Sequence, residues 1–355
     1  MKVKLILLIF LVFSKIIQAQ DKKSLDLNLE CIAFYNLENL FDTIIDPDTN
    51  KILQEDFTPF GSKKFKTEKY LLKLKNLAFV LDTIGKEITP LGPSIIGVCE
   101  IENKLVLEDL VSQSTIANKN YQIIHHEGPD ARGIDCALLY DPLHFKVTSS
   151  KSVKFTIPGN DRFRSRDQLV VSGELLGEKI HIIVIHWPSR RGGESKSRPK
   201  RIAAAKLSKS IVDSLQQINK KAKVIIMGDF NDDPISPSIA DFLKASGSTF
   251  LKNNQMHNTM YDHYKKGIGT LAYRDQWNLF DQFIITPSFI DNEKNYDDFT
   301  FYKSVVFNKS FLTTLEISLA IIELEKSVAI KLGKATGIGS TTPSVTSISN
   351  SGTFS

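Results

Sequence analysis

The stretch from Lys223 to Pro234, KVIIMGDFNDDP, is the one around which the rest of the sequence is organised. Four apolar residues, 224–227, lead into Gly228, and polar side chains follow at Asp229, Asn231, Asp232 and Asp233. A short apolar run that ends at a turn signal predicts a buried strand. Proteins of the α/β class place their chemistry where such strands end, although Asp, Asn and Gly are also ordinary turn formers. The stretch therefore predicts a strand followed by a polar turn or by functional residues.

The composition is that of a folded chain. With 355 residues and 42% hydrophobic content, the chain can bury a large core in one domain or two. The formal net charge of +5 is too small to indicate nucleic acid from bulk electrostatics. Cys31, Cys99 and Cys136 lie in apolar runs without the CxxC spacing of a zinc site, so we expect small core residues.

Residues 1–20 have the pattern of an export signal. Lys2 and Lys4 precede the apolar run 5–13, and Ala19 is a small residue suited to a cleavage point. Lys15 interrupts the apolar stretch well short of the roughly 20 residues that a spanning helix needs. We expect a cleaved signal, with an uncleaved anchor as the alternative. The mature protein is then exported, periplasmic or extracellular, without a membrane span.

Apolar runs recur along the chain and predict its elements. We expect strands over 29–35, 94–99, 121–125, 134–140, 145–155, 168–175, 179–186, 224–227 and 277–286, and helices over 67–84, 105–111, 202–218 and 236–245. Strand-helix-strand units alternate with hairpins, which argues against a doubly wound parallel sheet. An α/β (α+β) architecture with mixed or antiparallel sheets and helices outside fits better.

Polar groups recur just past the apolar runs of five predicted strands, at the strand ends. These groups are Asn36 and Glu38, Glu100, His186, Asp229 and Asn231, and Asp281. Brought together, they would form an acidic, oxygen-rich pocket of the kind that Mg²⁺ prefers when it shares its coordination with a substrate phosphate. A metal there can polarise a phosphoryl group. The cations Arg132, Arg166 and the 190–201 segment, which begins with Arg190, would hold the phosphate.

Each of these residues also has a simpler interpretation. Glu100 could cap the following helix, and His186 could be satisfied by backbone groups. The basic run 190–201 could be the solvated start of a helix. Arg166 could pair on the surface with an acid such as Asp167. Only the occurrence of all these residues together favours a functional site over these simpler interpretations.

With these residues in place, the chain resembles the endonuclease/exonuclease/phosphatase superfamily, which includes pancreatic deoxyribonuclease, abasic-site endonucleases, neutral sphingomyelinases and inositol polyphosphate phosphatases. The resemblance spans residues 30–310 and is carried by Gly228-Asp229-Phe230-Asn231 together with Glu100 after a buried strand. It implies a four-layered sandwich of two mixed β-sheets flanked by helices. It also implies Mg²⁺-dependent hydrolysis of a phosphate ester, with Mn²⁺ as a substitute.

The resemblance also implies roles for individual residues. Glu100 matches the principal metal ligand, with Asn36 beside it and Glu38 as a second acid near the metal. Asp229 matches the residue that orients or deprotonates the attacking water, and Asn231 matches an amide that steadies the phosphate.

Three further positions match the superfamily pattern. His186 matches a histidine that some nucleases place near the leaving group, and Arg166 matches a phosphate-contacting arginine. Asp281 matches the acid that positions a final histidine. We therefore expect a nuclease-like monomeric enzyme acting on DNA or RNA, with a lipid headgroup or a sugar phosphate as the alternative substrate.

The sequence departs from the superfamily near its end. The pattern closes with Ser-Asp-His on a last strand, whereas the last histidine here, His263, precedes Asp281. We expect a domain over 21–315 and an aberrant or disordered tail over 316–355, which is uncharged from residue 335 on. A shifted reading frame near residue 315 and a diverged terminus both explain the tail. A catalytically impaired protein that binds phosphate or nucleic acid is therefore a further alternative.

Overall fold

The computed structural model describes residues 27–49, 51–87, 89–273, 276–295, 297–312 and the backbone of 328–335. The predicted export signal, 1–20, lies outside the described residues. Of the predicted tail, only the strand β15 (Val328–Ala335) is described, so both predictions stay predictions. Residues Leu29–Lys334 form one unit, which holds the whole candidate site. None of the helices in the described ranges is both long and apolar enough to cross a membrane.

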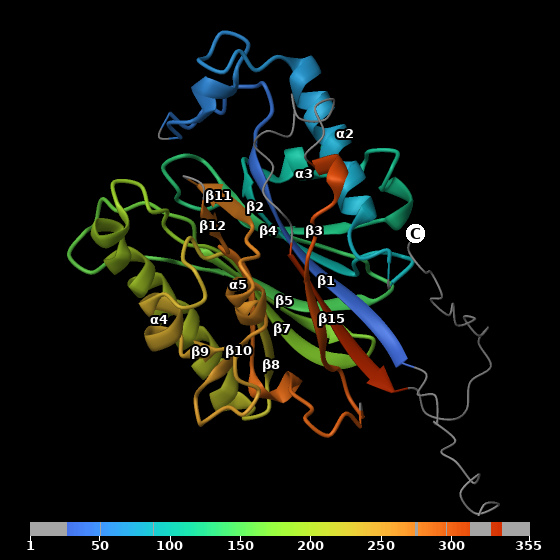
Figure 1. Cartoon of the computed structure of the whole chain (residues 1–355). Coiled ribbons are helices and arrows are strands. Elements are labelled where there is room, and N and C mark those ends of the chain that lie inside the picture. The colour runs from blue at the N-terminus through green and yellow to red at the C-terminus, as the bar shows by residue number, and fades with distance from the viewer. Residues whose placement is uncertain are drawn as a thin grey trace, which may run out of the picture. The chain divides into compact units, whose positions relative to one another are not determined.

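The first sheet has six strands in the order β14-β15-β1-β2-β4-β3 (Figure 1). Its other strands are β1 (Leu27–Leu40), β2 (Ile95–Ile101), β3 (Gln122–His125), β4 (Asp135–Tyr140) and β14 (Thr300–Val306). Strands β1 and β2 run parallel, while β4 runs antiparallel to both β2 and β3. The sheet is therefore mixed, and the ends of β1 and β2 lie at one edge.

The second sheet has seven strands in the order β5-β6-β7-β8-β13-β10-β9. They are β5 (Phe145–Val153), β6 (Gln168–Leu175), β7 (Glu178–His186), β8 (Lys223–Asp229), β9 (Ala245–Ser246), β10 (Met256–Asn258) and β13 (Asp281–Ile285). Strands β7 and β8 are parallel, and β13 is antiparallel to β8. A separate hairpin pairs β11 (Leu271–Tyr273) with β12 (Gln276–Asn278).

Helices cover the outer faces of the two sheets. The α-helices are α2 (Thr67–Thr83), α3 (Lys104–Val111), α4 (Glu194–Ile218) and α5 (Tyr261–Lys265). Single turns lie at η1 (Gln54–Phe57), η2 (Ala117–Lys119), η3 (Ser238–Phe242), η4 (Pro287–Phe289) and η5 (Ser310–Leu312). In Figure 1, α2 and α3 lie against the sheet that contains β2 and β4, and α4 lies beside β7 and β8.

The apolar runs are continuous because both faces of each central strand are buried. In β1, Ala33 and Tyr35 pack toward α2 and α3, whereas Ile32 and Phe34 pack against the second sheet. In β8, alternate residues face the first sheet and α4 in the same way. These contacts produce the four layers helix, sheet, sheet, helix, which confirms the predicted sandwich of two mixed sheets. The three cysteines are buried without a disulfide, as expected.

Two expected helices differ in the structure. Helix α4 begins at Glu194 rather than at residue 202 and contains Pro199. Its first turns are held by side chains, because Arg198 bonds Glu194 at 2.6 and 2.8 Å and the buried Arg201 bonds Ser197. The helix expected over 236–245 is only the single turn η3, because Ala245 already belongs to β9.

The segment 277–286 contains the expected strand with Asp281 and Gln282 as β13, and it also holds the end of β12, which belongs to a different sheet.

Candidate active site

Three neighbouring strands of the second sheet bring polar residues to one edge. His186 at the end of β7 is the register partner of Asp229 at the end of β8, and Asp229 is the register partner of Asp281. Asp281 was expected to follow an apolar run, but it begins β13. Because β13 runs antiparallel to β8, its first residue lies where the parallel strands end. The polar residues therefore lie together at this edge, although Asp281 stands at the start of its strand whereas His186 and Asp229 stand at the ends of theirs.

The end of β1 carries two further predicted residues on an irregular backbone. The pairing of β1 with β2 slips between Asn36 and Leu40, and Glu38 and Asn39 have φ of 49° and 57°. The Asn36 side-chain oxygen accepts the backbone N–H of Glu38 at 2.9 Å. Left-handed backbone at non-glycine residues is strained and gathers at functional sites. The irregular segment aims Asn36 and Glu38 differently from residues of a regular strand.

Glu100 links the two sheets at this edge. It has φ of 62°, and the backbone N–H of Asn39 donates to its Oε2 at 3.1 Å. Its other oxygen, Oε1, lies 3.7 Å from Nε2 of His186. The following helix α3 is capped by Asn103, whose side chain accepts the N–H of Val106 at 3.1 Å. The alternative that Glu100 caps this helix is therefore wrong.

His186 faces carboxylates rather than backbone groups. Its Nε2 lies 3.5 Å from Oδ2 of Asp229, and its Nδ1 has no hydrogen-bond partner among the described residues. Burial lowers the pKa of His186 well below its ordinary value, and the nearby guanidinium groups of Arg166 and Arg132 lower it further. The ring is thus neutral at pH 7 and can donate one hydrogen bond toward the acids.

Asp229 is a buried acid whose pKa lies near neutral pH. Burial raises the pKa of its carboxyl to about 7, and the neighbouring Glu100 adds to the increase. Its Oδ1 accepts the backbone N–H of Asn231 at 2.7 Å, which opposes the shift. The Asn231 side-chain amide in turn donates to the Trp187 carbonyl at 3.0 Å. The loop after β8 is therefore held from both ends.

Asp281 is the least satisfied acid of the edge. Its side chain is buried, and no hydrogen bond of ordinary geometry reaches its carboxylate oxygens within the described part of the chain, although the Thr270 hydroxyl lies near enough to lower its pKa. Burial and the adjacent Asp229 carboxylate raise the pKa of Asp281 well above its ordinary value. A buried carboxylate is costly unless a cation or donors compensate it.

The acids at this edge fit a divalent cation. The Glu100 carboxylate raises the pKa of both Asp229 and Asp281, and the Asp229 carboxylate raises the pKa of Asp281, as expected where like charges are held together. Carboxylate and amide oxygens are the hard donors that Mg²⁺ takes, and the two orphaned oxygens of Asp281 add further acceptors. The donor set predicted from the sequence, Asn36, Glu38 and Glu100, therefore lies beside an excess of negative charge.

A second group of metal-binding residue types lies elsewhere, on and after β3. One ligand atom from each of His125, Glu127 and Asp135 lies within 4.8 Å of the others. His125 and Asp135 already satisfy each other, with Nε2 and Oδ2 3.1 Å apart. The geometry is that of a structural hydrogen-bonded pair.

Two predicted arginines share one acid beside the site. Arg166 is buried, lies 3.1 Å from Asp130 and donates to the Trp187 carbonyl at 2.6 Å, so the alternative of a surface pair with Asp167 is wrong. Arg132 lies 3.6 Å from Asp130 and 3.8 Å from Oε1 of Glu100. Sequence reasoning missed Asp130, because an Asp in a turn-rich segment has no local feature that separates it from a turn former.

Arg190 joins the loop after β8 to the rest of the site. It lies 3.1 Å from both Asp232 and Asp233, donates to the Asn231 carbonyl and stacks over Phe280 at 4.5 Å. Its predicted contact with substrate phosphate stays a prediction.

Asp232 and Asp233, which pair with Arg190, are more than ordinary turn formers. Asp232 is 1% exposed, and its Oδ2 lies 2.7 Å from Nε of the fully buried Arg201. The basic segment is therefore not merely a solvated helix start. Ion pairs across 42 or more positions of sequence are invisible to local patterns, since only the fold creates them.

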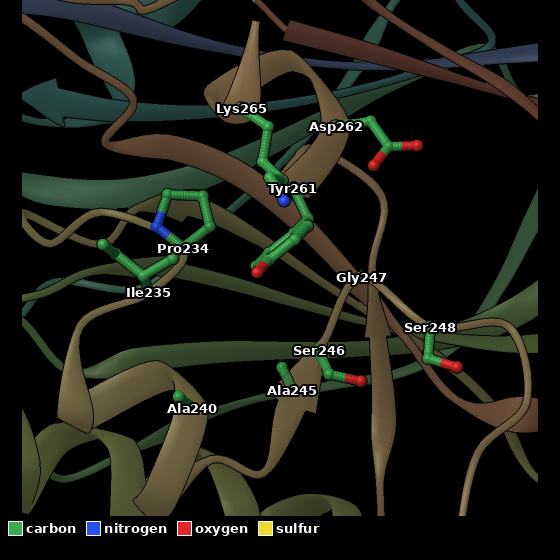
Figure 2. Close-up of a pocket in the computed structure, with 10 residues that line it drawn as sticks. All are labelled: Pro234, Ile235, Ala240, Ala245, Ser246, Gly247, Ser248, Tyr261, Asp262 and Lys265. Atoms are coloured by element: carbon green, nitrogen blue, oxygen red, sulfur yellow. The ribbon is translucent and has the colours of Figure 1, made fainter. Parts of the chain in front are cut away.

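The surface is hollowed on two sides of this loop. A hollow of about 730 Å³ is lined by Asn231, Arg190 and Phe280 together with the β11–β12 hairpin. A second hollow of about 500 Å³ lies between η3, β9 and α5, where the Tyr261 ring approaches Gly247 (Figure 2). A Cβ at Gly247 would lie 2.3 Å from that ring, so the contact requires glycine. Glu100, Asp229 and Asp281 are not among the residues that line this second hollow (Figure 2).

Comparison with known proteins agrees with this geometry. The chain shares the fold of D. rerio TDP2 complexed with a single-strand DNA product, at 13% identity and a TM-score of 0.52, over 86% of this chain and 99% of that one. It also shares the fold of the human Nocturnin catalytic domain with bound sulfate, at 13% identity and a TM-score of 0.51, over 87% and 97% of the two chains. No curated protein sequence matches the chain.

A third similar structure is an endonuclease/exonuclease/phosphatase family protein from Bacteroides thetaiotaomicron, at 14% identity and a TM-score of 0.50, over 88% of this chain and 97% of that one. At these identities the likeness establishes the fold alone. The family itself follows from the sequence, because the profile of the Endonuclease/Exonuclease/phosphatase family matches residues 31–319. The chain belongs to the endonuclease/exonuclease/phosphatase family.

Proposed function

We propose that the protein is an exported, Mg²⁺-dependent phosphodiesterase of nuclease type. One observation carries the proposal: Glu100, His186 and Asp229 meet within 3.5–3.7 Å at one edge, and Asp281 lies opposite Asp229. A neutral imidazole, an acid whose pKa lies near 7 and further carboxylates beside them suit the hydrolysis of a negatively charged ester. The likeness to D. rerio TDP2 with its single-strand DNA product supports a nucleic acid as substrate.

The residues divide the work by their protonation and position. Asp229, with a pKa of about 7, can take a proton from water at neutral pH. The neutral His186 donates a hydrogen bond at the same place, and we assign the phosphate position beside the Asn231 amide, which the Trp187 carbonyl holds in place. Arg132 and Arg166, which Asp130 orients, supply positive charge for the ester oxygens.

A divalent cation would be held by Glu100 with Asn36 and Glu38. When bound, it supplies Lewis-acid polarisation of the phosphoryl group and a counter-charge for the leaving oxygen. Mn²⁺ prefers similar oxygen ligands and is expected to substitute.

The test is hydrolysis by the purified full chain. DNA, RNA and bis(4-nitrophenyl) phosphate are incubated with Mg²⁺ or with EDTA, and we expect hydrolysis only with the metal. Glu100→Gln should remove it, whereas Glu108→Gln, an exposed acid on α3, should not. A folded protein that hydrolyses none of the three substrates with Mg²⁺ contradicts the proposal. Faster turnover of lipid or sugar phosphates than of nucleic acid would identify these smaller phosphate esters as the substrates.

A second candidate function is phosphate or nucleic-acid binding with little turnover. Its supporting observation is that no histidine follows His263 in the sequence while the Asp281 carboxylate accepts no hydrogen bond of ordinary geometry among the described residues. Loss of an acid-base histidine typically costs ~10²- to 10⁴-fold in rate. This function predicts Mg²⁺-dependent substrate binding that Glu100→Gln removes, without turnover in the parent protein. Turnover that Glu100→Gln abolishes would exclude it.

Export is tested separately on cells that express the full chain. We expect the protein outside the cytoplasm, with a mature N-terminus at residue 20 or 21 by N-terminal sequencing. Recovery of the chain from the cytoplasm with Met1 intact would contradict export.

A further inference from the structure

The hollow of about 730 Å³ reaches the proposed active site through Asn231 and Arg190, which line it. Asn231 lines it from the loop after β8, two residues beyond Asp229, and Phe280 lines it from the position before Asp281. Its volume is that of a site for a small organic group rather than for an ion. Whatever binds there is therefore held next to the reacting ester.

One face of the β11–β12 hairpin lines this hollow. Leu271 pairs with Asn278, and Tyr273 pairs with Gln276, so these four side chains share a face. All four line the hollow, and Tyr273 is 60% exposed. Trp277, paired with Ala272, lies on the opposite face of the same hairpin and is 49% exposed. An accessible aromatic ring and two amide side chains thus point the same way.

Another part of the lining consists of Arg191, Gly192, Gly193 and Glu194, and the Glu194 carboxylate is paired with Arg198 and Arg201. Arg191 lines the hollow and forms no ion pair within the described residues, whereas the neighbouring Arg190 is committed to Asp232 and Asp233. Gly192 and Gly193 have φ of 84° and 109°, and nothing lies within 4 Å of a Cβ placed at either. They leave a side-chain-free strip at the start of α4, where backbone N–H groups favour anions.

We propose that this hollow is a nucleobase subsite, which binds a base of a single-stranded nucleic acid next to the scissile phosphate. The inference rests on the proposed function and names its substrate class. An aromatic face stacks on any base, and the amides of Gln276 and Asn278 can pair with the polar base edge. The base must be unstacked to reach Tyr273, so single strands and frayed ends bind better than closed duplex.

The experiment measures base-dependent binding without turnover. The full chain carrying Asp229→Asn is titrated, with Mg²⁺ and by fluorescence anisotropy, against a short single-stranded oligonucleotide and an abasic phosphodiester chain of equal length. One stacked base contributes about 1–3 kcal/mol, so we expect the base-bearing chain to bind about 5- to 150-fold more tightly. Tyr273→Ala should remove most of this ratio. The matched control Trp277→Ala, on the other hairpin face, should keep it.

Three outcomes overturn the inference: equal binding of the two chains by the parent, equal effects of Tyr273→Ala and Trp277→Ala, or competition by phosphatidylinositol phosphate vesicles that Tyr273→Ala abolishes. Circular dichroism of each variant excludes misfolding as the cause. Hydrolysis of DNA, RNA and bis(4-nitrophenyl) phosphate by the chain with Asp229 intact separates the failure of the subsite from the failure of the proposed function. Turnover of at least one of the three substrates, without the expected base preference in binding, refutes the subsite alone. Turnover of none of them refutes the proposed function.

Discussion

Replacing Asp281 by Asn is expected to stabilise the metal-free protein. Asp281 is 1% exposed, and its oxygens accept no hydrogen bond of ordinary geometry in the described ranges. Because its pKa is raised in the folded protein, the folded state binds the proton more tightly than the unfolded chain does. The resulting penalty is absent below pH 3.8, the ordinary pKa of Asp, and grows as pH rises toward the raised pKa. Asn removes the charge at nearly constant shape.

An upper limit bounds the size of the effect. At pH 7 the penalty cannot exceed the free energy of holding a carboxyl of ordinary pKa 3.8 protonated, which is about 1.4 kcal/mol per pH unit, or about 4 kcal/mol. The buried neutral carboxyl and the Asn amide both lose hydration, so this cost largely cancels between the two proteins. We therefore expect the free energy of unfolding to increase by up to about 4 kcal/mol.

Urea unfolding in EDTA at pH 4.5 and pH 7.5 measures this difference. Asp281→Asn should gain stability at pH 7.5 and much less at pH 4.5, while Asp297→Asn, an exposed acid, should change stability by less than about 0.5 kcal/mol. Adding Mg²⁺ should narrow the gain, since the carboxylate then faces a cation. Destabilisation by Asp281→Asn at pH 7.5 in EDTA would refute the reasoning, because it would show that the charged carboxylate is favourably paired.

Three further predictions concern the framework of the site. Arg201→Met should lower the free energy of unfolding by about 3 kcal/mol in urea titrations, because it breaks the buried pair with Asp232; a loss under about 1 kcal/mol would show that the pair is replaceable. Gly228→Ala should abolish the soluble folded protein on gel filtration, since φ is 154° and its Cβ would lie 1.9 Å from a carbonyl oxygen; a normal yield of folded protein would contradict this. The hydrogen bond with Glu30 raises the pKa of His144, so its stabilisation is complete below pH 6.5 and is lost as pH rises through the raised pKa. His144→Gln should therefore cost more at pH 6 than at pH 9, by about 1 kcal/mol or less after solvent screening, and an equal loss at both pH values would show that the ion pair contributes nothing.

Local patterns predicted the central strands of both sheets, because a buried strand is marked by neighbouring apolar residues; the short strands β9 and β10 and the strand β14 were not predicted. The run 224–227 is apolar throughout, since β8 is covered on both faces, and Gly228 with Asp229 ends it. Glu100 was found in the same way, because it lies at the end of the buried strand β2. Helix α2 was predicted within one residue from its periodic apolar face, because that periodicity is set by the helix itself.

Positions that depend on distant partners were not predictable in this way. The start of α4 was missed, because the ion pairs of Glu194 and Arg201 hold a turn that contains Pro199. Asp130 was missed because its partners Arg132 and Arg166 meet it only in the folded chain.

The sequence by itself determined the apolar strands, the family and the residue types available for chemistry, since these depend on composition and short-range order. The tertiary structure alone decided which of these residues meet. Antiparallel pairing set Asp281 against Asp229, and long-range ion pairs turned Asp232 and Asp233 from turn residues into anchors of the catalytic loop. Contacts between segments far apart in sequence have no local signal, because only the packing of the two sheets brings their ends to one edge.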